Sequence, residues 1–410
     1  LYTGENKETT LYAVWSKGLS SYTVEYYKQN IDGSYPETAS ESVSRNGETD
    51  TALEGSVFEG YKKTIDGFTF ARYETSNEGN SLVVNGDGSL VIRFFYSRNE
   101  YKLVFDVNVP DSITSVKPST PEASTIKFEE EIGTRADVSV ERIGYTFVGW
   151  FYDADFTKEV KATDTFNFLA DTTVYAKYAA TDVTYTVEYY QYNLDKITPT
   201  LVESESPKAL ADTTITVKPA KTYDGFNTPV SQELLVRADG TSVVKFYFTR
   251  KTVTIKLTSG TGVKDVSITS SNSEIESIAD GYKVVFGASI TLSHTIVDGY
   301  TFDKYVVIVD GSENEIEATF TVENKDYEIV AKATANTYNL VYRAGLGEGA
   351  EISQTITFDT NFTVESGAGF TRNGYEFVGF AFAQDGASSF SAGESLSVSE
   401  FVKKAVEAGA

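Results

Sequence analysis

The chain contains one histidine, His294, and no cysteine. In the run Ser289-Ile-Thr-Leu-Ser-His-Thr-Ile296, the side chains of Ile290, Leu292, His294 and Ile296 fall on one face of an alternating strand. A partly buried strand residue is therefore the expected state of this imidazole. A zinc site of ordinary ligands needs several His or Cys at set spacings, and Ser-His-Asp or Cys-His chemistry needs orienting partners. Neither kind of site is predicted.

Carboxylates are abundant, with 59 Asp and Glu residues, and glycoside hydrolysis needs two of them. The sequence shows no domain large enough to hold a sugar cleft, so we predict that the chain is not an enzyme. Asn85-Gly-Asp-Gly-Ser89 resembles part of a calcium loop but lacks the spaced acidic positions, and it predicts a hairpin turn. Asp153 and Asp155 are interpreted as turn residues. No catalytic, cofactor-binding or metal-binding residue is assigned, and no cofactor is expected.

The net charge of −24 repels nucleic-acid phosphates and anionic lipid headgroups, so neither is an expected partner. No run of 18 apolar residues is present, which predicts no membrane-spanning segment in this stretch. The chain also lacks Met, which indicates a processed chain or a segment of a longer one.

The composition of the chain is typical of β-strands. Aromatic residues make up 13% of the chain, and Thr, Val and Ile recur in short alternating runs. A length of 410 residues suits several domains of about 100 residues each. We therefore expect a mainly β chain of several small domains.

One sequence pattern opens with Tyr22-Thr-Val-Glu-Tyr-Tyr27 and returns unchanged at residues 185–190. Both copies continue to Asp-Gly-Phe, at residues 66–68 and 224–226, and close on an aromatic strand at residues 90–96 and 243–248. These units resemble the repeats of mucin-binding proteins, in which a Tyr-x-Val-x-Tyr-Tyr strand opens a β-grasp-like module.

A second pattern is Gly144-Tyr-Thr-Phe-Val-Gly-Trp-Phe-Tyr152, closed by Thr173-Val-Tyr-Ala-Lys-Tyr178. It returns at residues 374–382, and a weaker version with Tyr305 in place of the Trp occupies residues 299–305. Strand alternation predicts that Phe147 and Trp150 lie on opposite faces. The pattern resembles the Listeria–Bacteroides repeat, the B-repeat type of internalin B.

The repeats predict a mainly β, tandem array of small β-grasp-like domains. The expected parts are a closing strand of an incomplete B-repeat at 1–18, mucin-binding-type repeats at 19–98 and 181–250, a B-repeat at 99–180, a divergent B-repeat at 251–335, and a B-repeat lacking its last strand at 336–410. Short junctions such as Ser97-Arg-Asn99 indicate a stiff, elongated rod.

The two ends of this array are complementary. Thr9-Thr-Leu-Tyr-Ala-Val-Trp15 matches the closing strand at residues 172–178, whereas the last repeat continues into an expected helix at 399–408 without such a strand. Two interpretations stay open here: a segment cut from a longer array, or exchange of Leu11, Tyr12, Ala13, Val14 and Trp15 into a neighbouring copy, which would build a head-to-tail polymer.

The family resemblances imply a non-catalytic, extracellular protein of the bacterial cell surface or cell wall. The absence of cysteine is also typical of surface proteins of Gram-positive bacteria. A stalk or filament subunit is the function that we expect, with the chain itself as partner. The alternative is an adhesin module that binds a host glycan or protein.

Overall fold

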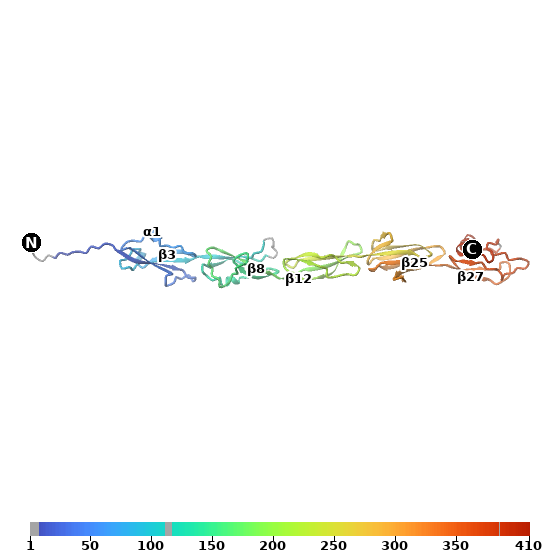
Figure 1. Ribbon diagram of the computed structural model, residues 1–410, viewed down its shortest axis with the longest axis horizontal. Coiled ribbons are helices and arrows are strands. Elements are labelled where there is room, and N and C mark those ends of the chain that lie inside the picture. The colour runs from blue at the N-terminus through green and yellow to red at the C-terminus, as the bar shows by residue number, and fades with distance from the viewer. Residues whose placement is uncertain (1–7, 111–116, 385) are drawn as a thin grey trace, which may run out of the picture. The chain divides into compact units, whose positions relative to one another are not determined.

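The computed structural model describes residues 8–110, 117–384 and 386–410, and strands dominate them (Figure 1). Among these residues the α-helices are α1 at Ser56–Glu59 and α2 at Val398–Glu407. The prediction of a mainly β chain with many small sheets is confirmed. The chain divides into two compact units: the first holds Leu1–Tyr185, Pro207–Thr214 and Leu235–Ser242, and the second holds the rest. The division into a first strand and five repeats stays a prediction.

The first sheet of the first unit has the order β2-β1-β4-β3. Its strands are β1 (Leu19–Lys28), β2 (Glu41–Glu48), β3 (Phe68–Thr75) and β4 (Val91–Arg98). The last strand, β4, runs parallel to β1 and lies between β1 and β3. Alternate aromatic side chains of β1 and β4 form the core, with Tyr26 stacked on Phe94 at 5.7 Å between ring centroids. The dense aromatics thus serve packing.

The second sheet of this unit repeats the arrangement, with the order β6-β5-β8-β7. Its strands are β5 (Glu100–Asp106), β6 (Ser124–Lys127), β7 (Tyr145–Phe151) and β8 (Thr172–Ala180). The closing strand β8 is parallel to β5 and antiparallel to β7, so it occupies the middle of the sheet. Val174 and Ala176 of β8 are both 0% exposed in the core.

The expected alternation along β7 is wrong at one point. The register with β8 shifts between Phe147 and Gly149, which is a β-bulge at Val148. The extra residue turns Phe147 onto the face of Trp150, and the two rings meet edge to face with centroids 5.4 Å apart. Both side chains therefore pack in the same core. Strict alternation of side chains along the strand does not predict this.

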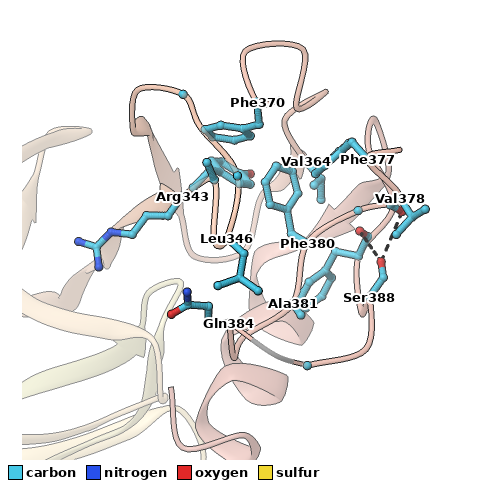
Figure 2. A pocket seen from close by; sticks show the side chains of 18 of the residues that line it. Arg343, Leu346, Val364, Phe370, Phe377, Val378, Phe380, Ala381, Gln384 and Ser388 are labelled. Carbon is cyan, nitrogen blue, oxygen red and sulfur yellow. Dashed lines mark hydrogen bonds between the residues drawn. The ribbon is translucent and has the colours of Figure 1, made fainter. Parts of the chain in front are cut away.

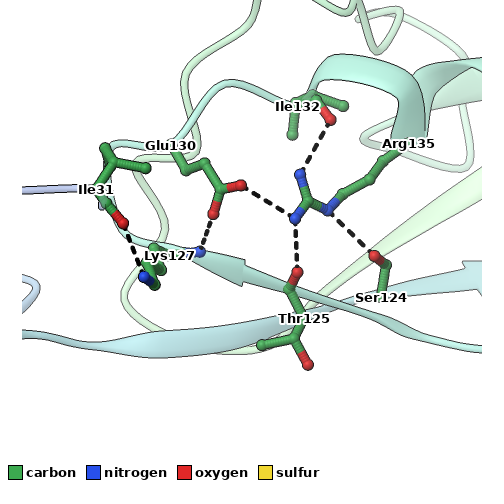
Figure 3. A network of polar contacts seen from close by, with 7 residues as sticks. All are labelled: Ile31, Ser124, Thr125, Lys127, Glu130, Ile132 and Arg135. Atoms are coloured by element: carbon green, nitrogen blue, oxygen red, sulfur yellow. Dashed lines mark hydrogen bonds and ion pairs between the residues drawn. The ribbon is translucent and has the colours of Figure 1, made fainter. Parts of the chain in front are cut away.

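The edge strand β6 is held by a polar network around Arg135 (Figure 3). The guanidinium donates to the Thr125 carbonyl at 2.8 Å and the Ser124 hydroxyl at 3.1 Å, and it pairs with Glu130 at 3.1 Å. Glu130 in turn accepts the Lys127 amide, and the Lys127 ammonium donates to the Ile31 carbonyl at 2.7 Å. The contacts of Arg135 hold β6 in place, and the contact of Lys127 joins β6 to the loop that follows β1.

Short strands follow. β9 (Asp182–Thr184) pairs with β12 (Lys208–Leu210), and β13 (Thr213–Val217) pairs with β15 (Gln232–Val236). In the second unit, the sheet β11-β10-β16-β14 again places a closing strand parallel to an opening one. Its strands are β10 (Thr186–Tyr192), β11 (Pro199–Glu205), β14 (Phe226–Asn227) and β16 (Val243–Arg250).

The largest sheet of the second unit has the order β19-β20-β17-β25-β22-β23, with β25 parallel to β17. A smaller sheet, β18-β21-β24, packs on it through a shared apolar core. The strands are β17 (Thr252–Ser259), β18 (Val263–Ser270), β19 (Glu276–Ile278), β20 (Gly281–Val285), β21 (Ser289–Ile296), β22 (Tyr300–Val309), β23 (Ser312–Ile316), β24 (Thr319–Thr321) and β25 (Tyr327–Ala335). Tyr305, which stands where the motif has Trp, is 4% exposed in this core.

The last part of the second unit is the exception. Strands β26 (Thr337–Tyr342) and β27 (Ile352–Thr357) form one pair, and β28 (Asn361–Thr363) and β29 (Ser395–Ser397) form another. Helix α2 follows β29, one residue earlier than the sequence predicts. Among the described residues no strand lies parallel to β26 as β8 lies parallel to β5.

Candidate functional site

The five residues expected at a polymer interface, Leu11 to Trp15, belong to no sheet in the structure. The side chains of Leu11, Tyr12, Val14 and Trp15 are 91%, 86%, 95% and 88% exposed. An apolar segment of this length normally lies in a core or under a partner. It is therefore a candidate for binding.

The repeat of β5 to β8 provides the complete form of the last repeat. The strand Tyr101-Lys-Leu-Val-Phe105 corresponds to Tyr338-Asn-Leu-Val-Tyr342, and residues 144–152 correspond to residues 374–382. In the complete form, β8 bonds with both segments. In the last repeat, residues 375–382 contain no strand. Within this segment, Phe380 forms an isolated β-bridge with Phe390.

The segments that flank β8 in the complete repeat have less buried counterparts in the last repeat. Leu103 and Trp150 are 0% and 1% exposed beside β8, whereas their counterparts Leu340 and Phe380 are half-buried. Tyr375 and Phe377 are 67% and 41% exposed, whereas their counterparts Tyr145 and Phe147 are half-buried. The apolar side chains that β8 covers in one repeat are thus partly in water in the other.

Between these segments lies a groove with a volume of about 1350 Å³. It is lined by residues 340–347 and by residues 375–384, together with Phe362, Val364 and Phe370. Figure 2 shows Leu346, Phe370 and Phe380 around it, with Phe377 and Val378 farther out. We call it the acceptor groove.

Backbone features of the acceptor groove match those of the complete repeat. Gly379 has φ 143° where Gly149 has φ 156°, so the bulge conformation is kept without the closing strand. Arg372 lies over the ring of Tyr375 at 3.9 Å, and Arg142 lies over Tyr145 at 3.7 Å. The last repeat thus keeps the glycine conformation and the Arg–Tyr contact that the complete repeat has beside β8.

Leu11 to Trp15 were predicted from the sequence, whereas the acceptor groove was not. The signal was the return of the motif of residues 144–152 at residues 374–382. Carrying the register of β8 onto the last repeat would have named Leu340, Tyr342 and Phe380 as its lining.

The residues considered for chemistry serve structure instead. His294 is half-buried as predicted, with Nδ1 2.6 Å from the Tyr305 hydroxyl and its ring stacked on Phe302 at 3.8 Å. Burial raises the pKa of Tyr305. Asp87 accepts the amide and hydroxyl of Ser89 in a turn, and Asp153 accepts those of Thr157.

Within residues 8–110, 117–384 and 386–410, no group of three or more His, Cys, Asp or Glu side chains is placed to hold a metal ion. The same residues contain no helix with the length and apolarity needed to cross a membrane.

Comparison with known proteins identifies part of the chain. Residues 101–177 and 338–402 match the Listeria-Bacteroides repeat domain, which includes both the complete repeat of β5 to β8 and the open repeat. This match indicates a repeat protein of the bacterial surface. The mucin-binding resemblance of the other repeats stays a prediction. No curated protein matches the sequence.

Among solved structures, the TIE protein of Bacillus anthracis aligns with 11% identity and a TM-score of 0.27. The alignment covers 78% of this chain and 66% of the solved TIE chain. This chain therefore spans just under two thirds of the length of the TIE chain. A TM-score this low supports no conclusion about function.

Proposed function

We propose that this chain is a non-catalytic stalk or filament subunit on the outer surface of a bacterium, joined to its neighbours by strand exchange. The observation that carries the proposal is the pairing of a free strand with an open groove. Residues 9–15 of one copy would fill the acceptor groove of another, in the place that β8 fills in the complete repeat.

The sequence of the free segment fits that place residue by residue. Leu11 and Ala13 correspond to Val174 and Ala176, which are buried in β8, and Trp15 corresponds to Tyr178. Burying a side chain the size of Leu contributes about 1.5–3 kcal/mol, and strand addition also supplies main-chain hydrogen bonds. The exposed carbonyls and amides of β26 and residues 375–382 would gain partners at the same time.

The experiment measures the mass of the purified 410-residue chain by light scattering across a range of concentrations. We expect species of increasing mass, since each copy has one donor segment and one acceptor groove. Ala13→Asp would place a carboxylate where Ala176 is buried, and it should leave only monomers. Ser16→Asp is the control, because the corresponding Ala179 is exposed.

A chain that stays monomeric at every concentration would overturn the proposal, as would unchanged assembly of the Ala13→Asp variant. The first result would leave the acceptor groove for another strand. The second would place the contact between copies elsewhere on the molecule.

A further inference from the structure

Two arginines lie at the ends of closing strands, Arg98 at the end of β4 and Arg250 at the end of β16. We infer that each is a clamp that couples the folding of its own sheet to the folding of the sheet that follows. The contacts involved all lie inside one chain, and each junction lies within one compact unit. They are therefore independent of strand exchange between copies.

A single residue, Asn99, connects β4 to β5 at the first junction. Its amide donates to the Gly67 carbonyl at 2.9 Å, and its carbonyl accepts the Phe128 amide at 3.0 Å. Phe128 follows β6 of the second sheet, yet its ring is 8% exposed in the core of the first sheet, edge to face on Phe68. A side chain that comes from the second sheet thus completes the core of the first.

The Arg98 guanidinium binds both sides of this junction. Its Nε donates to the carbonyl of Gln29, directly after β1, at 2.9 Å, and its Nη1 donates to the Phe128 carbonyl at 2.6 Å. The guanidinium also lies over the Phe68 ring at 4.7 Å, and the side chain is 10% exposed. Because a buried cation needs its acceptors, unfolding of either sheet takes a partner away from the other.

The same clamp recurs at Arg250 in the second unit. Its Nε donates to the Tyr192 carbonyl at the end of β10 at 3.0 Å, and its Nη1 donates to the Phe286 carbonyl at 2.9 Å. The guanidinium lies over the Phe226 ring at 4.9 Å. Burial lowers the pKa of Arg250, in agreement with a guanidinium that is held away from water. Both main-chain bonds of the first clamp are thus present in a second pair of sheets.

The main-chain bonds, and not an ion pair, are what the two clamps share. Arg98 also pairs with Glu129 at 2.7 Å, but the residue after the phenylalanine at the second clamp is Gly287. Glu129 and Gly287 both have positive φ, at 60° and 83°. A Cβ on Gly287 would lie 2.7 Å from Nη1 of Arg250, so the second clamp takes a glycine where the first takes an acidic residue.

Two other junctions have the single connecting residue without the clamp. Thr181 and Asn336 follow β8 and β25, and their amides donate to glycine carbonyls as that of Asn99 does. The strands before them end in Ala180 and Ala335, which carry no guanidinium. The clamp therefore distinguishes the junctions after β4 and β16, and we expect the sheets on either side of these two to unfold together.

The test is amide hydrogen exchange on the full chain, with a perturbation placed in the second sheet only. Ala176→Asp puts a carboxylate at a position that is 0% exposed in the core of β5 to β8. Exchange should accelerate along β1 and β4 as well, by about tenfold, which is a typical size for coupling between two sites. When Arg98→Gln is already present, Ala176→Asp should accelerate exchange along β1 and β4 by less than about twofold.

Arg93→Gln is the matched control, because Arg93 lies on the same strand and pairs with Glu25 of its own sheet at 3.4 Å. The tenfold response should persist in that variant. Arg98→Lys keeps the charge but not the forked donors, so it should reduce the response while β1 and β4 stay protected, even where Arg98→Gln loosens the first sheet. The clamp is refuted if Ala176→Asp leaves exchange along β1 and β4 unchanged in the wild-type chain. It is also refuted if Arg98→Gln and Arg98→Lys both transmit the effect as Arg93→Gln does.

Discussion

Ala176 of β8 lies directly opposite Trp150 of β7, and the two side chains are 0% and 1% exposed. The same place in the last repeat holds Phe380, which is half-buried and has no strand across from it among the described residues. One alanine therefore marks the difference between a closed repeat and an open one. Its counterpart in the free segment is Ala13.

The first prediction concerns Ala176→Asp. A carboxylate beside Trp150 has no cationic partner in the core, so we expect a loss of stability on the order of 3 kcal/mol in this repeat. Amide hydrogen exchange along β7 and β8 measures that loss locally, which suits a chain of several repeats. Ala179→Asp, at an exposed position of the same strand, should leave exchange unchanged. Equal effects of the two variants would contradict the role of Ala176 in the core.

The second prediction concerns the junction between the first two sheets. Gly67 has φ 75°, and a Cβ there would overlap the ring of Phe128, which packs edge to face on Phe68. Gly79→Ala is the control, because Gly79 has φ 60° with nothing within 4 Å of a Cβ. Both changes strain the backbone, but Gly67→Ala also displaces a ring, at an additional cost of about 1–3 kcal/mol.

Thermal unfolding and limited proteolysis at residues 97–99 compare these two variants. Earlier unfolding and faster cleavage are expected for Gly67→Ala. If Gly79→Ala is cleaved as fast, the contact between Gly67 and Phe128 does not hold the junction. The same packing recurs between Gly225 and Phe286, and between Gly299 and Phe358, so further variants can repeat the comparison.

The third prediction concerns acid. The hydrogen bond from the Thr157 amide, with further bonds from the Thr157 hydroxyl and the Lys158 amide, lowers the pKa of Asp153 from its ordinary value of 3.8. A lowered folded pKa means stabilisation that is complete above pH 3.8 and is lost as the pH falls through the folded pKa. Asp153→Asn should thus lower stability at pH 7 and reduce its loss on acidification.

Unfolding midpoints measured from about pH 7 to pH 2 check this expectation, since the loss lies between the ordinary pKa of an Asp and the lower folded pKa of Asp153. Asp155→Asn removes the same charge from the same turn and serves as the control. A pH dependence that is the same in Asp153→Asn as in the wild-type chain would show that the turn contributes nothing to acid stability.

Much of the fold was predictable because the aromatic sequence motifs recur along the chain, and each copy marks the position of a strand. The motif at residues 299–305 placed Tyr305 at the centre of a core, where the structure has it. The face of Trp150 was not predictable from alternation, since a bulge adds one residue and reverses the face of all that follows.

One of the two parts of the candidate site was predictable from the sequence. Leu11 to Trp15 were identified because they match a strand elsewhere in the chain. The acceptor groove depends on which two segments flank that strand in space, and this is a property of the sheet order β5-β8-β7 that the sequence does not state. The packing of Phe128 on Gly67 was missed for the same reason.

The last prediction fixes the register of the exchanged strand. Tyr175 lies opposite Phe151 in β8 and β7, so Tyr12 of one copy should lie opposite Ala381 of another. Antiparallel partners lie about 4.5–5.5 Å apart between Cα atoms, which is within the range of a disulfide. Because the chain has no cysteine, the double variant Tyr12→Cys with Ala381→Cys carries only the two introduced thiols.

Under mild oxidation this variant should form covalent ladders on a non-reducing gel, which collapse to one band on reduction. Tyr12→Cys with Val378→Cys is the control, since Val378 is 76% exposed and three residues out of register, and it should give far fewer linked chains. Equal ladders from both pairs would mean collision rather than a defined register. Ladders from the control pair alone would place the strand at a different depth in the acceptor groove.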